Sequence, residues 1–301
     1  MTARPSLFER AAEIYDFESG LRVDPVPHDL PPKPEEPFEP IAGPAEPAPH
    51  RAPRPVRAGT RRTESVDLAA LEAAGCLLPD AASSALAEEI RIIKRRLLKA
   101  IDDRAERDPR ARVALIASGQ RGEGKTFLAL NLALSIAGEH ERAVLLVDGD
   151  TSQPEIGTRL GIEAEAGLVD ALADRAVDPE SLVIDTDIDG LSILPAGRRE
   201  RNVPELLASA RTEEVLERLL AADPQRIILI DSPPALAAST ASVLAGHAGQ
   251  TLVVVRADAT SEADLKDTVG LLGGPTRLSL VLNSASLSIG GRRFGHYEES
   301  R

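Results

Sequence analysis

Aromatic residues are scarce in this chain of 301 residues, which has five Phe, two Tyr and no Trp. Proteins that bind single-stranded nucleic acid stack the bases on aromatic side chains, so the composition excludes such a stacking platform. The formal net charge of -13 also argues against a general binder of the phosphate backbone. We therefore expect no nucleic-acid partner.

Cysteine and long apolar runs are also lacking. Cys76 is the single cysteine, so the chain cannot form an internal disulfide or a cysteine cluster for a metal. No apolar run approaches the roughly 20 residues that span a bilayer. The charged segment 1–17 lacks the apolar core of a signal peptide. We expect a cytoplasmic chain that reaches a membrane through a partner.

Composition divides the chain into four parts. Residues 1–22 carry a capping box at 6–9 and then apolar residues at helical spacing, which predicts a short amphipathic docking helix. Residues 23–62 are rich in Pro and end in several Arg, as is typical of a disordered linker. Residues 63–285 have the apolar content of a folded domain, and residues 286–301 form a polar, flexible tail.

Short apolar runs alternate with helical segments in the predicted domain. Several runs are continuously apolar, as expected of strands that are covered on both faces. The predicted strands are 113–117, 143–147, 191–194, 226–230, 251–255 and 278–282. This alternation predicts an α/β fold with a doubly wound, mostly parallel sheet and helices on both faces.

The strongest local signal is a loop of the G-x-x-x-x-G-K-[ST] type between the strand 113–117 and a predicted helix, 127–137. Backbone amides of such a loop surround phosphates, and the helix amino end adds positive potential. We expect Lys125 to reach the β- and γ-phosphates and the Thr126 hydroxyl to bind Mg²⁺. The residues predicted to bind ATP here are Gly119, Gln120, Arg121, Gly122, Glu123, Gly124, Lys125, Thr126 and Phe127.

Acidic residues follow two other predicted strands. Asp148 and Asp150 end one strand, and Asp231 ends another. Ligands of open α/β sheets bind at the carboxyl ends of the strands, so these carboxylates are expected to converge on the glycine-rich loop. One such Asp alone would fit a helix cap equally well, whereas three together favour a Mg²⁺–nucleotide site. The sequence thus predicts nucleotide hydrolysis or phosphoryl transfer.

The order of these motifs resembles the bacterial tyrosine kinases of capsule and exopolysaccharide export, and among them the exosortase-associated tyrosine autokinases. The resemblance runs from residue 66 to residue 283. It includes the glycine-rich loop, the Asp-x-Asp motif that ends in Pro154, the Asp231-x-Pro-Pro motif and the Leu-Pro-Ala-Gly sequence at 194–197.

The resemblance implies a role for each residue of the site. Asp148 would be the base that accepts the tyrosine proton, and Lys125 and Asp150 would complete the catalytic group. Thr126, Asp150 and Asp231 would hold Mg²⁺. ATP and Mg²⁺ are therefore the expected cofactors.

Four more residues match positions of the family. Glu88, Arg91 and Lys94 match its E-x-x-R-x-x-R subunit-contact motif, with Lys in the last place, which implies a homo-oligomer. They lie off the apolar stripe of their predicted helix, where a solvated face with an internal Glu–Arg pair is the alternative. Asn283 is implied near the base of the nucleotide, and a turn residue is the alternative there.

Two positions depart from the family pattern. Ser152 stands where the motif after the Asp-x-Asp pair has an arginine, and the tail has Tyr297 in place of a tyrosine cluster. We interpret Tyr297 as the phosphoacceptor because its segment is polar and rich in Gly and Arg.

The resemblance implies an ATP-dependent protein-tyrosine autokinase, with ATPase activity, that regulates the chain length or export of a polysaccharide. Its implied partners are a membrane-embedded chain-length regulator or co-polymerase and a cognate tyrosine phosphatase, and its implied place is at the inner membrane. One alternative is a partitioning-type switch ATPase, although Gln120 replaces the signature lysine of that class. The other is a nucleotide-binding scaffold with reduced catalysis.

Overall fold

The computed structural model describes residues 61–78, 84–139, 141–200, 202–273 and 277–285. The expected docking helix, nearly all of the linker and the tail with Tyr297 lie outside the described residues. The predictions for those segments stay predictions.

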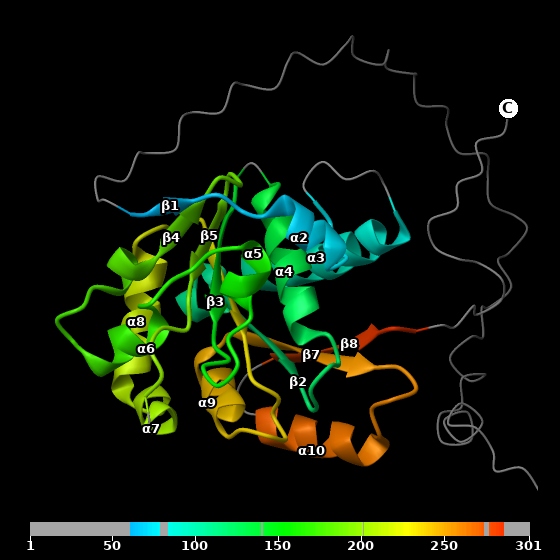
Figure 1. The fold of residues 1–301 in the computed structure, drawn as a ribbon. Coiled ribbons are helices and arrows are strands. Elements are labelled where there is room, and N and C mark those ends of the chain that lie inside the picture. The colour runs from blue at the N-terminus through cyan, green and yellow to red at the C-terminus, as the bar shows by residue number, and fades with distance from the viewer. Residues whose placement is uncertain (1–60, 79–83, 140, 201, 274–276, 286–301) are drawn as a thin grey trace, which may run out of the picture. The chain divides into compact units, whose positions relative to one another are not determined.

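One eight-stranded sheet forms the centre of the described domain (Figure 1). The strands are β1 Thr63–Glu64, β2 Val113–Ser118, β3 Ala143–Asp148, β4 Ile184–Thr186, β5 Leu191–Leu194, β6 Arg226–Asp231, β7 Gln250–Arg256 and β8 Arg277–Asn283. Their order is β1-β4-β5-β3-β6-β2-β7-β8. Of these neighbouring pairs, only β4 and β5 are antiparallel.

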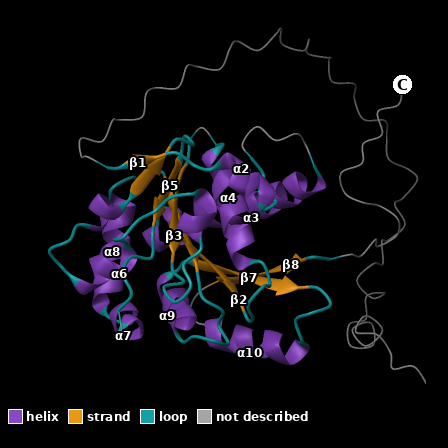
Figure 2. Cartoon of the chain, in the orientation of Figure 1, coloured by secondary structure: helices purple, strands orange, loops and turns teal. Residues whose placement is uncertain are grey.

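Helices cover both faces of the sheet (Figure 2). The helices that pack on one face are α2 Leu68–Ala73, α3 Ala85–Ala105, α4 Lys125–Ala137 and α5 Ile156–Leu160. Those on the other face are α6 Leu168–Ala173, α7 Val203–Leu207, α8 Ala210–Ala221, α9 Thr240–His247 and α10 Glu262–Leu272. The predicted α/β fold with a mostly parallel sheet and two helical layers is confirmed.

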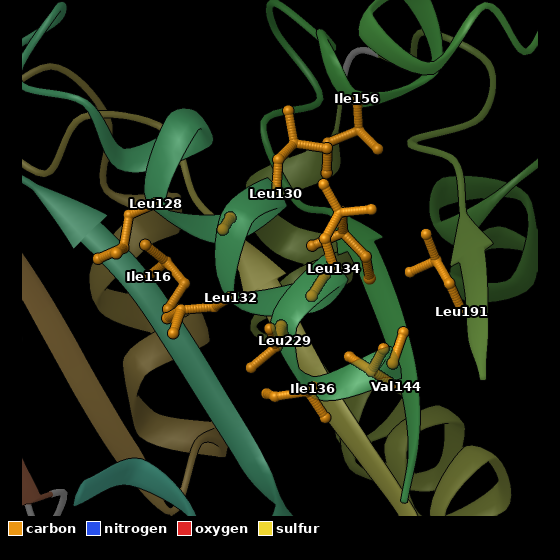
Figure 3. Close-up of a cluster of buried hydrophobic side chains, with 14 of the residues drawn as sticks. Ile116, Leu128, Leu130, Leu132, Leu134, Ile136, Val144, Ile156, Leu191 and Leu229 are labelled. Atoms are coloured by element: carbon orange, nitrogen blue, oxygen red, sulfur yellow. The ribbon is translucent and has the colours of Figure 1, made fainter. Parts of the chain in front are cut away.

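The continuous apolar runs divide their side chains between two cores. In β3, Val144 and Leu146 pack under α4, whereas Leu145 and Val147 pack under the opposite layer. Successive side chains of a strand point to opposite faces, so a strand covered on both sides needs apolar residues throughout. Helix α4 is itself buried nearly all round, and its leucines lie against β3, β5 and β6 (Figure 3).

The far edge of the sheet was not predicted. Strands β1 and β4 have only two and three residues, too few for a periodic signal. The side chains of Arg61 and Arg226 both pair with the carboxylate of Glu180, and Arg226 is only 2% exposed. Arg61, assigned to the linker from composition, therefore lies within the described fold and ties β1 to it.

Candidate active site

The glycine-rich loop joins β2 to α4. Gly122 and Gly124 adopt positive φ angles of 77° and 105°, which a glycine reaches without strain. Gly124 also passes so close to Asn283 that an added Cβ would lie 2.2 Å from its Nδ2 atom. No side chain of the described residues caps the first turn of α4, so its amide groups are left for an anion.

Five predicted side chains meet at the carboxyl end of the sheet. Asp148 and Asp231 end β3 and β6 and are paired in register. The ammonium Nζ of Lys125 lies 3.7 Å from Oδ2 of Asp150. The Thr126 hydroxyl lies beside the carboxyl of Asp231 and acts to lower its pKa, against the larger effect of burial. The structure thus brings the loop and all three acids to one place.

Two of these carboxyl groups are buried and therefore poorly hydrated. Asp148 and Asp231 are each 1% exposed, and the Oδ1 atom of each has no hydrogen-bond partner among the described residues. Burial raises the pKa of Asp148 to about 7. Burial also raises the pKa of Asp231 to about 7, against the opposing effects of Lys125 and Thr126. A bound cation would favour the charged form of both groups.

The donor set fits Mg²⁺ together with a nucleotide. Thr126, Asp150 and Asp231 offer only oxygen atoms, which are the ligands that Mg²⁺ prefers. In the described part of the chain, no three or more His, Cys, Asp or Glu side chains form a metal cluster. Protein sites usually hold Mg²⁺ through one or two carboxylates, waters and the substrate phosphates. The residues therefore fit a cation that binds with its nucleotide.

Ser152, which replaces the family arginine, fixes the orientation of Asp150. Its hydroxyl donates to Oδ1 of Asp150 at 2.7 Å, and the backbone amide of Gln153 donates to the same oxygen at 3.1 Å. The other oxygen, Oδ2, lies toward Lys125. The departure from the family pattern therefore removes a charge but supplies a hydrogen bond to the acid.

A cavity of about 400 Å³ lies beside Asp148. It is lined by many small or apolar residues: Pro154, Gly157, Thr158, Gly161, Ile162, Glu163, Ala164, Pro195, Ala196 and Gly197. The backbone amide of Ile156, the first residue of α5, donates to Oδ2 of Asp148 at 3.1 Å. Asp148 is therefore held in place by the start of α5 and lines this cavity.

The remaining loop residues differ in where their side chains lie. Gln120 and Arg121 are exposed, and the ring of Phe127 packs against the apolar core. The carboxylate of Glu123 is buried away from the other acids, where it accepts a hydrogen bond from Thr260. Asn283 donates from Nδ2 to the carbonyl oxygen of Glu123 at 2.8 Å. The contact of Thr260 was missed because no local motif marks this residue, and Ser152 was singled out only as the replacement of an arginine.

The three residues of the expected subunit contact have different surroundings. Glu88 and Arg91 pair with each other on α3, and each side chain is 41% exposed. The side chain of Lys94 is only 12% exposed and pairs with Glu139. It also donates to the carbonyl oxygen of Ser135, in the last turn of α4, at 3.0 Å. Lys94 therefore ties α3 to α4, while Glu88 and Arg91 face outward.

Comparisons of this chain with known proteins found a family model and several relatives. A family model described as an AAA domain matches residues 111–270, more than half of the chain. The chain is 33% identical over 178 residues to tyrosine-protein kinase wzc of Salmonella typhimurium. The aligned region covers 58% of this chain and 24% of that protein. It is 30% identical over 155 residues to tyrosine-protein kinase YwqD of Bacillus subtilis, covering 52% of this chain and 64% of that protein.

A solved structure supports the same relationship. The BceF tyrosine kinase domain aligns with a TM-score of 0.56 and 30% sequence identity, covering 65% of this chain and 76% of that one. The chain corresponds to only 24% of the length of wzc, so the match concerns one part of that relative. Within the described residues, no helix is both long and apolar enough to cross a bilayer.

Proposed function

The chain belongs to the AAA domain family and is a homologue of bacterial tyrosine-protein kinases, and we propose on this basis that it is an ATP-dependent protein-tyrosine autokinase. The observation that carries the proposal is the position of Asp148. Its carboxylate ends a strand beside the phosphate-binding loop and also lines a cavity large enough for an acceptor side chain. A hydrolase of nucleotide alone needs room only for water.

The residues of the site divide the work of phosphoryl transfer. The loop amides and the Lys125 ammonium would bind the phosphates, and Thr126, Asp150 and Asp231 would hold Mg²⁺. When bound, this cation neutralises charge on the phosphate oxygens. The Oδ2 atom of Asp148 is held by the Ile156 amide, and Oδ1 has no partner among the described residues. We assign to this carboxylate the acceptance of the tyrosine proton.

The biological setting is proposed from the resemblance to export kinases. The autokinase would regulate the chain length or export of an exopolysaccharide from the cytoplasmic side of the inner membrane. It would work with a membrane-embedded chain-length regulator and as a homo-oligomer. A tyrosine phosphatase would reverse the modification.

The acceptor is tested with the two tyrosines of the chain, Tyr15 and Tyr297. We expect Tyr297→Phe to remove most phosphotyrosine after incubation with Mg²⁺–ATP and to leave ATP hydrolysis nearly unchanged, because the ring is substrate and not part of the site. Mass spectrometry of the tail peptide measures this directly. Tyr15→Phe is the matched control. Label that persists in Tyr297→Phe and vanishes in Tyr15→Phe would place the acceptor at the other end of the chain.

The oligomer contact is tested on α3. We expect Arg91→Glu to shift the assembly toward monomers, because it reverses an outward-facing charge. It should change the melting temperature little, since an exposed ion pair contributes at most about 1 kcal/mol. Lys94→Met is the comparison, and it should lower the melting temperature because Lys94 joins α3 to α4. Sedimentation velocity at matched concentration measures the size of the assembly. An unchanged profile for Arg91→Glu would mean that Glu88 and Arg91 are only a solvated pair.

A further inference from the structure

The phosphate-binding loop contains a buried carboxylate that the mechanism does not use. Glu123 is only 4% exposed. Its Oε2 atom accepts from the backbone amide of Gln120 at 2.8 Å, and its other oxygen accepts from the Thr260 hydroxyl. Burying a carboxylate is costly unless hydrogen bonds replace its water. These contacts therefore define where the loop can lie.

Thr260 is itself held rigidly. It lies between β7 and α10, where its hydroxyl oxygen accepts from the Arg256 amide at 2.9 Å and its own amide donates to the Arg256 carbonyl at 3.0 Å. Within this turn Asp258 adopts a φ of 59°, in the left-handed region. The Arg256 guanidinium donates back to the Gly122 carbonyl at 3.3 Å. The turn after β7 therefore donates two hydrogen bonds to the phosphate-binding loop, one from Thr260 and one from Arg256.

The end of β8 completes the arrangement. The side chain of Asn283 donates to the Glu123 carbonyl at 2.8 Å, and its backbone carbonyl accepts from the Ala257 amide at 2.9 Å. Two segments that are remote in sequence, the turn after β7 and the end of β8, thus fix one side of the loop. We call Glu123, Thr260 and Asn283 the loop clamp.

We propose that the loop clamp, through Glu123 and Thr260, positions the phosphate-binding loop for ATP before the nucleotide arrives. Glu123 touches no phosphate in this role; it acts through the backbone of its own loop. A loop already held in its binding shape loses less conformational freedom on binding, which increases affinity. The inference rests on the proposed ATP site and assigns roles to Glu123 and Thr260 within it.

The test is the affinity for Mg²⁺–ATP, measured by isothermal titration calorimetry on the full chain. We expect Thr260→Val to weaken binding about tenfold, as the loss of one hydrogen bond to a charged group would. Glu123→Ala should weaken it at least as much, and the double variant no more than Glu123→Ala, because the two side chains act as a unit. Thr260→Ser should restore binding. At saturating ATP the turnover number of Thr260→Val should stay near that of the wild type.

Thr186→Val is the matched control. Thr186 is likewise a part-buried threonine whose hydroxyl accepts from one amide, but it donates to the carbonyls of Ile188 and Leu191 and lies in β4 at the far side of the sheet. It should lower the melting temperature as Thr260→Val does, without changing ATP affinity. Wild-type affinity in Thr260→Val, or an additive loss in the double variant, would overturn the loop clamp. The titration needs no phosphoryl transfer, so absent phosphotyrosine with intact binding would instead contradict the kinase.

Discussion

Asp148→Asn should lower phosphotyrosine formation by about 10²–10⁴-fold, the usual worth of a general base. The amide keeps the shape of the carboxylate and can still accept from the Ile156 amide through its oxygen. It cannot take up a proton from a tyrosine hydroxyl. The affinity for Mg²⁺–ATP should change much less, because the assigned cation ligands are Thr126, Asp150 and Asp231.

The fold should tolerate this substitution. Asp148 is almost fully buried, and burial raises its pKa to about 7, so the charged form is disfavoured in the free protein. A neutral side chain avoids that cost. Asp108→Asn is a suitable control, because Asp108 caps the turn before the amino end of β2, whereas the site lies at the carboxyl ends of the strands. If nucleotide affinity and transfer fell together in Asp148→Asn, Asp148 would be reassigned as a ligand of the cation.

Lys125→Met should lower turnover about 10³-fold, to a level that can no longer be measured. The variant lacks a fixed positive group beside the charge that develops on the phosphates during transfer. Its ammonium is the cation that lies near Asp150 and that lowers the pKa of Asp231. Methionine has a similar length but no charge, so the phosphates would lose the one ammonium group assigned to them and Asp150 would lose the cation beside it. ATP hydrolysis and phosphotyrosine formation should both disappear.

A matched lysine separates this effect from a general loss of charge. Lys266 is exposed on α10 and pairs with Glu262 one turn away. Lys266→Met should leave turnover and stability near wild type, since exposed pairs of this kind contribute little. Circular dichroism of Lys125→Met should show an intact fold. Wild-type turnover in Lys125→Met would contradict the assignment of this loop as the phosphate-binding site.

The central strands could be predicted because burial on both faces leaves a continuous apolar run. The runs at 113–117, 143–147 and 226–230 became β2, β3 and β6, each one residue longer at its carboxyl end. That extra residue in β3 and β6 is an aspartate of the site, which pairs across the sheet. Strands β1 and β4 had no such run; β4 depends on pairing with β5, and β1 depends on pairing with β4 and on the ion pairs of Glu180.

The site was predictable as far as local motifs reach. The loop and the three acids follow from residue type and strand ends, whereas the contact of Glu123 with Thr260 joins positions 137 residues apart. Lys94 shows a different limit. Its position on α3 lies off the apolar stripe, yet its long side chain reaches back along the surface to the carboxyl end of α4. Helical spacing places a Cβ atom and does not determine where a flexible ammonium group binds.

The most direct measurement of the central claim is phosphotyrosine on the purified 301-residue chain after incubation with Mg²⁺–ATP, compared with Lys125→Met under the same conditions. Intact-mass spectrometry and phosphopeptide mapping report both the amount and the position of the label. We expect phosphotyrosine in the wild type, concentrated at Tyr297, and none in Lys125→Met. Wild-type protein that hydrolyses ATP yet carries no phosphotyrosine would contradict the autokinase and favour a switch ATPase built on the same nucleotide site.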